Sequence, residues 1–383
     1  MRTVIRNGKV LTPEGWLQHA SVILYDGKIA EITDRPVDVS DIECVDASDC
    51  YVVPGFIDLH VHGGGGYDFM EGTAKAFDTV IKTHLRHGTT AILPTLAASS
   101  FEMMEQAAEE TTRQMSCPNS PVIGLHLEGP YLNPSMAGGQ IPEYIRKVEP
   151  KEYQSLVTRY PCIRRWDVAP ELEGAMEFGS YLVEQGIVVG VAHTTADYSL
   201  MKEAWKHGYT HATHFYNGMK GFHKEGEYKH EGTVESVYLL QDMTVELIAD
   251  GKHVPPAILQ LVHQIKGVEK ICLITDAMAP TDCISAIAFD HRVIVEDGVA
   301  KLADRSALAG SVSTMDRLIR IMVNEAGIPL EDAIRMASES PAKRMGIYDR
   351  KGSLQNGKDS DVVVLDDDLN ICAVWQMGQR VCL

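Results

Sequence analysis

Several features are missing from this sequence, and each absence excludes a class of protein. No apolar run reaches the 18 or so residues that a membrane-spanning helix needs, so we expect no membrane partner. The first residues lack the apolar core of a secretory signal peptide, so we expect a cytoplasmic protein. The eight cysteines include no close-spaced Cys-x-x-Cys pair, which excludes a zinc knot and argues for reduced thiols over a disulfide framework.

Basic residues are also scarce. The chain has 35 lysines and arginines against 53 acidic residues, a net charge of −18, so nucleic acid would be repelled. The same charge gives no general attraction for an anionic small molecule, and recognition of one must be local.

The length of the chain and its local sequence patterns predict two domains. Its 383 residues exceed one ordinary core unless the core is a barrel. Short strand-like runs with turns at Asn7-Gly8 and Asp26-Gly27 occupy the N-terminal part, and the same texture returns after residue 360. We therefore expect residues 1–53 and 350–383 to form one small β-sandwich domain.

Residues 54–349 have the alternating pattern of βα units. Helical segments are expected at 73–87, 101–115 and 313–326. Eight buried-strand candidates lie at 55–60, 89–95, 122–128, 163–169, 187–193, 210–214, 245–250 and 271–276. Eight such strands predict an α/β fold, a closed (β/α)8 TIM-type barrel whose active site lies at the C-terminal ends of its strands.

Metal-ligating side chains stand at the ends of these strands. They are His60, Glu128, His193, His214, Asp250 and Asp276, with His62 on the same strand face as His60. Imidazole and carboxylate ligands without cysteine are typical of catalytic zinc, iron, manganese or cobalt. We expect one divalent ion held by His193, His214 and Glu128, and a second held by His60 and His62 with Glu128 bridging.

Asp276 remains for proton transfer, besides its place among the metal ligands. A metal-bound water has its pKa lowered to roughly 7, and a neighbouring carboxylate can take its proton as the hydroxide attacks a carbonyl. The same carboxylate can then return the proton to a leaving nitrogen. This set of groups predicts hydrolysis of an amide.

Other histidines and glycines have simpler interpretations. A single buried histidine is more often a hydrogen-bonded core residue than a ligand. His126, two residues before Glu128, is either a hydrogen-bonding partner of the site or a structural residue beneath it. We expect His84, His87, His207 and His211 to be helix or helix-cap residues without a role. Residues 63–66 are four glycines without the context of a phosphate-binding motif, and loop freedom explains them equally well.

The motifs resemble a known family along nearly the whole chain. Pro-Gly-Phe-Ile-Asp-Leu-His-Val-His at 54–62 is shared by many amidohydrolases. His-Leu-Glu-Gly-Pro at 126–130 and Thr-His-Phe-Tyr-Asn-Gly-Met at 213–219 are more specific. In this order they resemble the N-acetylglucosamine-6-phosphate deacetylases of the amidohydrolase superfamily.

The resemblance implies a homodimer that removes the acetyl group from N-acetyl-D-glucosamine 6-phosphate in amino-sugar catabolism, giving D-glucosamine 6-phosphate and acetate. Glu128, His193 and His214 match the shared metal ligands, and Asp276 matches the general base and acid. His60 and His62 match members with a second metal. The residues that match substrate contacts are Gln140, Asn217, Gly218, His253 and Ala309.

One segment departs from the family pattern. Members usually carry an Arg-Glu-Pro-Gly element whose arginine reaches the phosphate of the partner's substrate, whereas residues 220–232 here are longer and contain no arginine. Lys229 or Lys224 can supply the charge, although lysine lacks the bidentate fork of arginine. We take Lys229 as the candidate phosphate contact; a solvated loop is the alternative.

Several alternatives stay open at this point. The substrate can be the galacto epimer or an unphosphorylated acetamido sugar, and the chain can be another amide hydrolase of the superfamily. A non-catalytic assembly protein is disfavoured because the ligand set is complete. The sequence does not fix the metal, the epimer or the need for phosphate.

Overall fold

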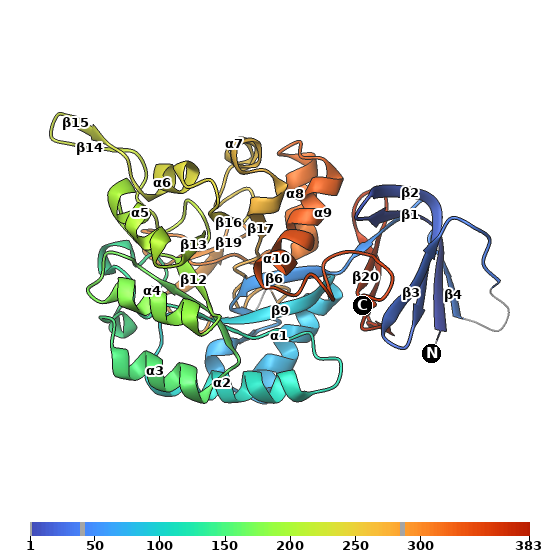
Figure 1. The fold of residues 1–383 in the computed structure, drawn as a ribbon, viewed down its shortest axis with the longest axis horizontal. Helices are drawn as coiled ribbons and strands as arrows, with labels where there is room; N and C mark the ends of the chain where they lie inside the picture. The colour runs from blue at the N-terminus through green and yellow to red at the C-terminus, as the bar shows by residue number, and fades with distance from the viewer. Residues whose placement is uncertain (1, 39–42, 284–287) are drawn as a thin grey trace.

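The computed structural model describes residues 2–38, 43–283 and 288–383. The chain forms a barrel of parallel strands surrounded by helices, with a separate sheet domain beside it (Figure 1). The predicted fold class, a TIM-type barrel with a separate β-domain from both chain ends, is therefore confirmed. No helix within the described ranges is long and apolar enough to cross a membrane.

The sheet domain is built from both ends of the chain. In Figure 1 the blue N-terminal strands and the red C-terminal strands lie together. The strands are β1 (Arg2–Thr12), β2 (Gly15–Tyr25), β3 (Lys28–Thr33), β4 (Glu43–Asp46), β5 (Tyr51–Pro54), β20 (Val362–Leu365), β21 (Ile371–Gln376) and β22 (Gln379–Arg380). Strands β20 and β5 join the two ends, with Val363 opposite Val53. Alternating apolar residues such as Val22, Val52 and Trp375 fill its core.

One of the two predicted turns in this domain is wrong. Asp26-Gly27 does connect β2 to β3, with both residues at positive φ as a tight hairpin requires. Asn7-Gly8 instead lies inside β1, where the pairing register with β2 shifts on both sides of Gly8. A bulge and a turn share the same local chemistry, so only the pairing of β1 with β2 distinguishes them.

The barrel contains all eight predicted strands in chain order. They are β6 (Phe56–Val61), β9 (Thr89–Leu96), β10 (Leu125–Glu128), β11 (Ile163–Val168), β12 (Val188–Val191), β13 (Tyr209–Ala212), β16 (Thr244–Leu247) and β17 (Ile271–Leu273). The barrel closes where the backbone N–H of Asp276 donates to the carbonyl of His60 at 2.8 Å. The Thr275 hydroxyl donates to the buried Asp58 carboxylate at 2.5 Å beside this contact.

Helices cover the outside of the barrel. They are α1 (Ala74–Arg86), α2 (Phe101–Ser116), α3 (Pro150–Arg159), α4 (Ala175–Glu184), α5 (Tyr198–Lys206), α6 (Thr233–Leu239), α7 (Pro256–Lys266), α8 (Met315–Asn324), α9 (Leu330–Met336) and α10 (Glu339–Arg344). The three predicted helices correspond to α1, α2 and α8. Thr73 and Ser100 begin the first two by accepting backbone N–H groups, which is the usual N-cap contact.

Four of the remaining histidines were predicted to lie in helices or at their caps. His84 lies in α1, and His87 and His207 cap α1 and α5, as expected. His211 does not: it is a buried residue of strand β13.

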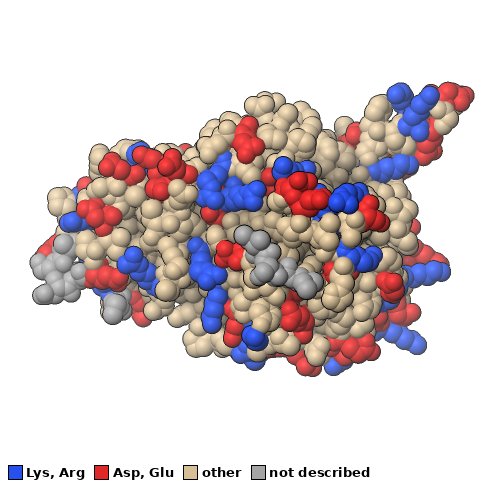
Figure 2. Space-filling model, turned by 180° about the vertical axis from the view of Figure 1, so that it is seen from behind, with Lys and Arg blue, Asp and Glu red and all other residues tan. Residues whose placement is uncertain are grey.

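Short two-stranded sheets are attached to the barrel. They are β7 (Gly63–Gly64) with β8 (Tyr67–Asp68), β14 (His223–Glu225) with β15 (Tyr228–His230), and β18 (Val293–Glu296) with β19 (Val299–Leu302). The β14–β15 hairpin is the segment without arginine, and it projects well beyond the body of the molecule (Figures 1 and 2). Lys224 lies directly opposite Lys229 on it.

Candidate metal centre and pocket

The side chains predicted to bind metal meet at one end of the barrel. Glu128 is the last residue of β10, and His193 and His214 each lie two residues past the end of β12 and β13. His193, His214 and Asp276 adopt positive φ values of 46°, 28° and 48°. This backbone conformation is strained for non-glycine residues. The turn that it produces directs each side chain over the barrel axis.

Glu128, His193 and His214 form the first buried triad. Glu128 Oε1 lies 2.8 Å from His193 Nε2 and 2.9 Å from His214 Nε2. The two Nε2 atoms are 3.2 Å apart. Three ligand atoms so close to one another can be bound by a single cation.

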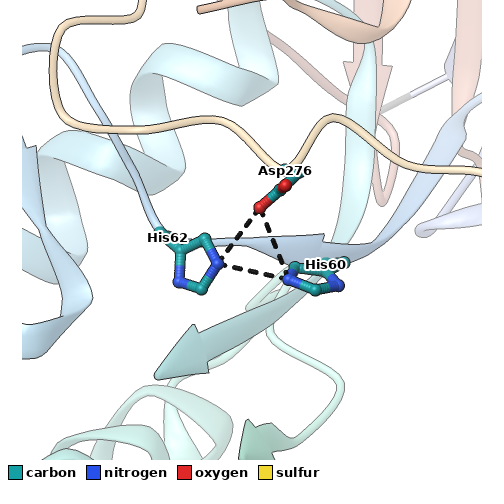
Figure 3. A group of neighbouring side chains, drawn as sticks. All are labelled: His60, His62 and Asp276. Atoms are coloured by element: carbon teal, nitrogen blue, oxygen red, sulfur yellow. Dashed lines mark hydrogen bonds and ion pairs between the residues drawn. The ribbon is translucent and has the colours of Figure 1, made fainter. Parts of the chain in front are cut away.

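His60, His62 and Asp276 form the second buried triad. Figure 3 shows the three side chains pointing toward one another, with the histidines on or just past β6 and Asp276 on the facing loop. Asp276 Oδ1 lies 3.1 Å from His62 Nε2 and 3.5 Å from His60 Nε2. Glu128 Oε2 lies 3.3 Å from His62 Nε2 and 3.5 Å from His60 Nε2. Each oxygen of Glu128 therefore faces a different triad.

This donor set fits divalent cations. Glu128 Oε2 is buried without a hydrogen-bond partner in the structure, which is costly for a carboxylate unless a cation contacts it. Burial lowers the pKa of His62, but the neighbouring carboxylates of Asp276 and Glu128 outweigh it and raise that pKa to about 9. The site thus attracts positive charge, which protons or metal ions can supply.

The second ring nitrogen of each of three histidines is also held. His193 Nδ1 donates to the Met136 carbonyl at 2.7 Å, and His214 Nδ1 donates to the Asn217 carbonyl at 3.1 Å. His60 Nδ1 lies 3.2 Å from Glu246 Oε2. These contacts fix each ring with Nε2 toward the centre, which is how metal-binding histidines are oriented.

A pocket of about 310 Å³ opens above the two triads. Five of the six residues predicted to contact substrate line it: Gln140, Asn217, Gly218, His253 and Ala309. Lys229 does not line this pocket. It lies on the projecting hairpin, with its ammonium 5.4 Å from the centre of the Phe222 ring.

Contacts around these five residues hold the pocket wall. Gln140 accepts the backbone N–H of Ala98 at 2.7 Å and places its amide nitrogen 3.4 Å from His193 Nε2. Gly218 has a φ of 60°, and a Cβ there would lie 2.9 Å from His193 Nδ1, so only glycine fits. The Asn217 backbone N–H already donates to the His214 carbonyl, so this N–H group stabilises the turn.

Asp250 is not near either triad. Its carboxylate lies 2.8 Å from His253 Nδ1 and accepts the backbone N–H of His253 at 2.8 Å. A strand-end carboxylate that looked like a metal ligand therefore orients a pocket histidine.

The run of four glycines does not form a phosphate cradle. The N–H groups of Gly63, Gly65 and Gly66 donate to the carbonyls of Ala277, Thr281 and Ala279. A Cβ on Gly63 would lie 2.6 Å from the backbone nitrogen of Ala279. The glycines permit close approach between this loop and the segment after Asp276.

Sequence reasoning missed other pocket residues and the buried charges beneath them. Asp68, at the end of the two-residue strand β8, lines the pocket together with the loop residues Tyr216, Met278, Phe289 and Asp290, and none of these segments has a periodic pattern. Arg165, Asp167 and Glu246 lie inside barrel strands and are fully buried. Charged residues within strands that were predicted to be buried were the available signal for these three.

The pocket has little positive charge of its own. Its lining includes Asp68, Glu128, Asp276 and Asp290, but within the described part of the chain no lysine or arginine. The nearby Arg292 is paired with Asp290 at 2.6 Å and donates to the Gln140 carbonyl.

Comparison with known proteins shows which family has this architecture. The model of the Amidohydrolase family matches residues 51–381. The chain is 33% identical to the N-acetylgalactosamine-6-phosphate deacetylase of Escherichia coli O157:H7, with 99% of each chain covered. It is 31% identical to the N-acetylglucosamine-6-phosphate deacetylase of Bacillus subtilis (strain 168), over 96% of this chain and 94% of the relative. A mutant N-acetyl-D-glucosamine-6-phosphate deacetylase from Mycobacterium smegmatis, solved in complex with N-acetyl-D-glucosamine-6-phosphate, is 30% identical and superimposes over 100% of both chains with a TM-score of 0.90.

Proposed function

The chain belongs to the amidohydrolase family, and we propose that it is a metal-dependent deacetylase of N-acetyl-D-glucosamine 6-phosphate. Its products are D-glucosamine 6-phosphate and acetate. The observation that carries this proposal is the pair of buried triads that share Glu128 below a pocket of sugar size.

The protein side chains have separate roles in this reaction. The triads would hold a divalent metal, which would supply the positive charge that polarises the amide carbonyl and acidifies the attacking water. Asp276 takes a proton from that water as its oxygen bonds to the carbonyl carbon. Asp276 then gives the proton to the amide nitrogen as the carbon–nitrogen bond breaks, so the amine leaves neutral. Burial raises the pKa of Asp276, but His60 and His62 outweigh it and keep the carboxyl ionised, as a base must be.

We propose two metal ions per subunit. Glu128, His193 and His214 would hold one, and His60, His62 and Asp276 would hold the other, because each oxygen of Glu128 faces a different triad. The ligand types suit zinc, iron, manganese and cobalt alike. The His60–His62 site is expected to be the weaker of the two.

Recognition of the phosphate is proposed to involve Gly218, His253 and a second subunit. Gly218 and His253 line the pocket, which lacks a lysine or arginine among the described residues. Lys224 and Lys229 do not line their own pocket, and they lie on a hairpin that projects from the body of the molecule, so we propose that they reach the pocket of a partner. This arrangement supports the predicted homodimer, which remains part of the proposal.

The galacto epimer is the second candidate substrate. It is favoured by the 33% identity with an N-acetylgalactosamine-6-phosphate deacetylase over 99% of both chains. The two sugars differ at one hydroxyl, and discrimination depends on which pocket group that hydroxyl meets.

An acetate-release assay tests both candidates. The panel contains N-acetylglucosamine 6-phosphate, its galacto and manno epimers, and the unphosphorylated sugars. We expect the highest kcat/KM with the gluco 6-phosphate. A higher value with the galacto 6-phosphate would select the second candidate, and preference for an unphosphorylated sugar would contradict the phosphate assignment.

The predicted cytoplasmic location remains part of the proposal. Eight free cysteines, all within the described ranges, suit a reducing compartment.

A further inference from the structure

A fully buried arginine lies in the middle of the barrel, beneath the metal centre. Arg165, on β11, is 0% exposed and donates to two carboxylates, Glu246 and Asp167. It also donates to the Thr213 hydroxyl at 2.9 Å and to the Leu59 carbonyl at 3.3 Å. A guanidinium with five donors can hold several acceptors in fixed positions at once.

The first carboxylate connects Arg165 to a metal-ligating histidine. Arg165 Nη2 donates to Glu246 Oε2 at 3.0 Å, and Arg165 Nη1 donates to Glu246 Oε1. Glu246 Oε2 in turn lies 3.2 Å from His60 Nδ1. Glu246 therefore fixes the rotation of the His60 ring, with Nε2 toward the cluster.

The second carboxylate connects Arg165 to the backbone between the two histidines. Arg165 Nη2 donates to Asp167 Oδ2 at 2.8 Å, and His126 Nε2 donates to the same oxygen at 2.8 Å. His126 Nδ1 lies 3.0 Å from the Thr95 hydroxyl. That hydroxyl oxygen accepts the backbone N–H of Val61 at 3.0 Å.

Three of these contacts converge on one side of the metal centre. They end at the Leu59 carbonyl, the His60 ring and the Val61 N–H, which lie consecutively along β6. The rings of His193 and His214 are held instead by the backbone carbonyls of Met136 and Asn217. The network also reaches the backbone on the other side, but not a histidine ring there. The backbone N–H of His214 donates to Glu246 at 3.2 Å, and the hydroxyl of the preceding Thr213 accepts from Arg165 and donates to Asp167.

We propose that Arg165, acting through Glu246 and Asp167, is a positioning residue for the His60–His62 metal site and not for the other site. This inference rests on the two-metal centre of the proposed function. It assigns a role to three buried charges that touch neither substrate nor metal.

The test compares metal affinity in variants that keep the shape of the network. Glu246→Gln removes the acceptor that faces His60, and Asp167→Asn weakens the contact to His126. Zinc content and zinc affinity are measured by titration and mass spectrometry on metal-depleted protein. In each variant we expect the affinity of the His60–His62 site for its ion to fall about 10- to 100-fold. The affinity of the Glu128–His193–His214 site should stay within about 3-fold of wild type.

A matched control removes a buried charge elsewhere. Lys266, on α7, donates to the carbonyls of Val237, Leu240 and Met243 and contacts neither triad. Lys266→Met should lower thermal stability while both ions bind as in wild type. Excess zinc should restore activity to Glu246→Gln, which a merely misfolded variant would not show.

Each of three results would overturn either the positioning role of Arg165 or the proposed function. Wild-type affinity for both ions in Glu246→Gln and Asp167→Asn overturns the positioning role. Equal loss of both ions in these variants also overturns it, because the network would then support the whole barrel end. Failure of the wild-type protein to bind any divalent ion overturns the proposed function itself.

Discussion

Asp276 and Glu128 are both buried carboxylates of the metal centre, but their contacts differ. Glu128 has histidine nitrogens around both of its oxygens. Asp276 approaches the histidines through Oδ1 and stands at the end of the barrel where the pocket begins. Glu128 is therefore suited to holding ions, and Asp276 to exchanging a proton with a bound molecule.

Asp276→Asn should separate metal binding from catalysis. An amide cannot take the proton, so kcat should fall about 10²- to 10⁴-fold while at least one ion remains bound. Steady-state kinetics and metal analysis on the same sample measure the two effects. Glu128→Gln is the comparison variant and should lose metal as well as activity. Deacetylation at the full wild-type rate in Asp276→Asn would mean that another group transfers the proton.

The β14–β15 hairpin is an element whose form points to a role outside its own subunit. Lys224 and Lys229 stand opposite each other, although like charges at paired positions repel. Phe222 and Tyr228 on the same hairpin are 62% and 66% exposed. Acidic and basic side chains are otherwise interspersed over the face seen in Figure 2, where the hairpin extends from the upper right.

Neutralising the hairpin should affect only phosphorylated substrates. In Lys224→Gln/Lys229→Gln we expect KM for the sugar phosphate to rise about 10-fold or more, because a charge-assisted hydrogen bond contributes about 1.5–3 kcal/mol. The value of kcat, and KM for the unphosphorylated sugar, should change little. Lys202→Gln, an exposed lysine on α5, controls for net charge. Equal changes in KM for both sugars would argue that the hairpin does not meet the phosphate.

Helices α1 and α8 are joined by a half-buried ion pair that makes stability depend on pH. His87, which caps α1, has Nδ1 3.2 Å from Asp316 Oδ1 in the first turn of α8. Burial raises the pKa of Asp316, but hydrogen bonds from His87 and Thr314 outweigh it and lower the pKa from 3.8 to about 2. A lowered folded-state pKa stabilises the protein above pH 4, and this contribution is lost as the pH falls through 2.

Asp316→Asn tests this linkage. Relative to wild type, the variant should lose about 2 kcal/mol of unfolding free energy at pH 6, and the difference should shrink toward zero near pH 2. Urea unfolding at a series of pH values gives both curves. A difference that stays constant with pH would show that the lost contact is not ionic.

The whole molecule should depend on its metal ions for stability. The barrel end carries Glu128 and Asp276 in a buried site, and ions that bind only the folded state stabilise it by mass action. At a free metal concentration 100-fold above Kd, the gain is about 2.7 kcal/mol per ion.

Removal of the ions by chelation should therefore lower Tm, and added zinc should restore it. Differential scanning calorimetry at fixed protein concentration measures the shift. The Glu128→Gln variant should show a smaller shift, because it has less metal to lose. An identical Tm with and without chelator would contradict a structural contribution of the metal.

The sequence by itself determined the strands, the helices with strong amphipathic patterns and the residues at strand ends. These features depend on local alternation and on caps such as Thr73 and Ser100, which neighbouring residues specify. The candidate metal ligands could be predicted for the same reason, because parallel strands in a barrel bring their C-terminal ends together whatever lies between them.

Only the tertiary structure decided what each charged side chain faces. Asp250 stands at a strand end like a ligand but holds His253, and His211 lies in a strand against Glu246. The projection of Lys229 depends on how a hairpin leaves the barrel. The Arg165 network joins strands β6, β9, β10, β11 and β16, and no local pattern encodes contacts between strands so far apart in the chain.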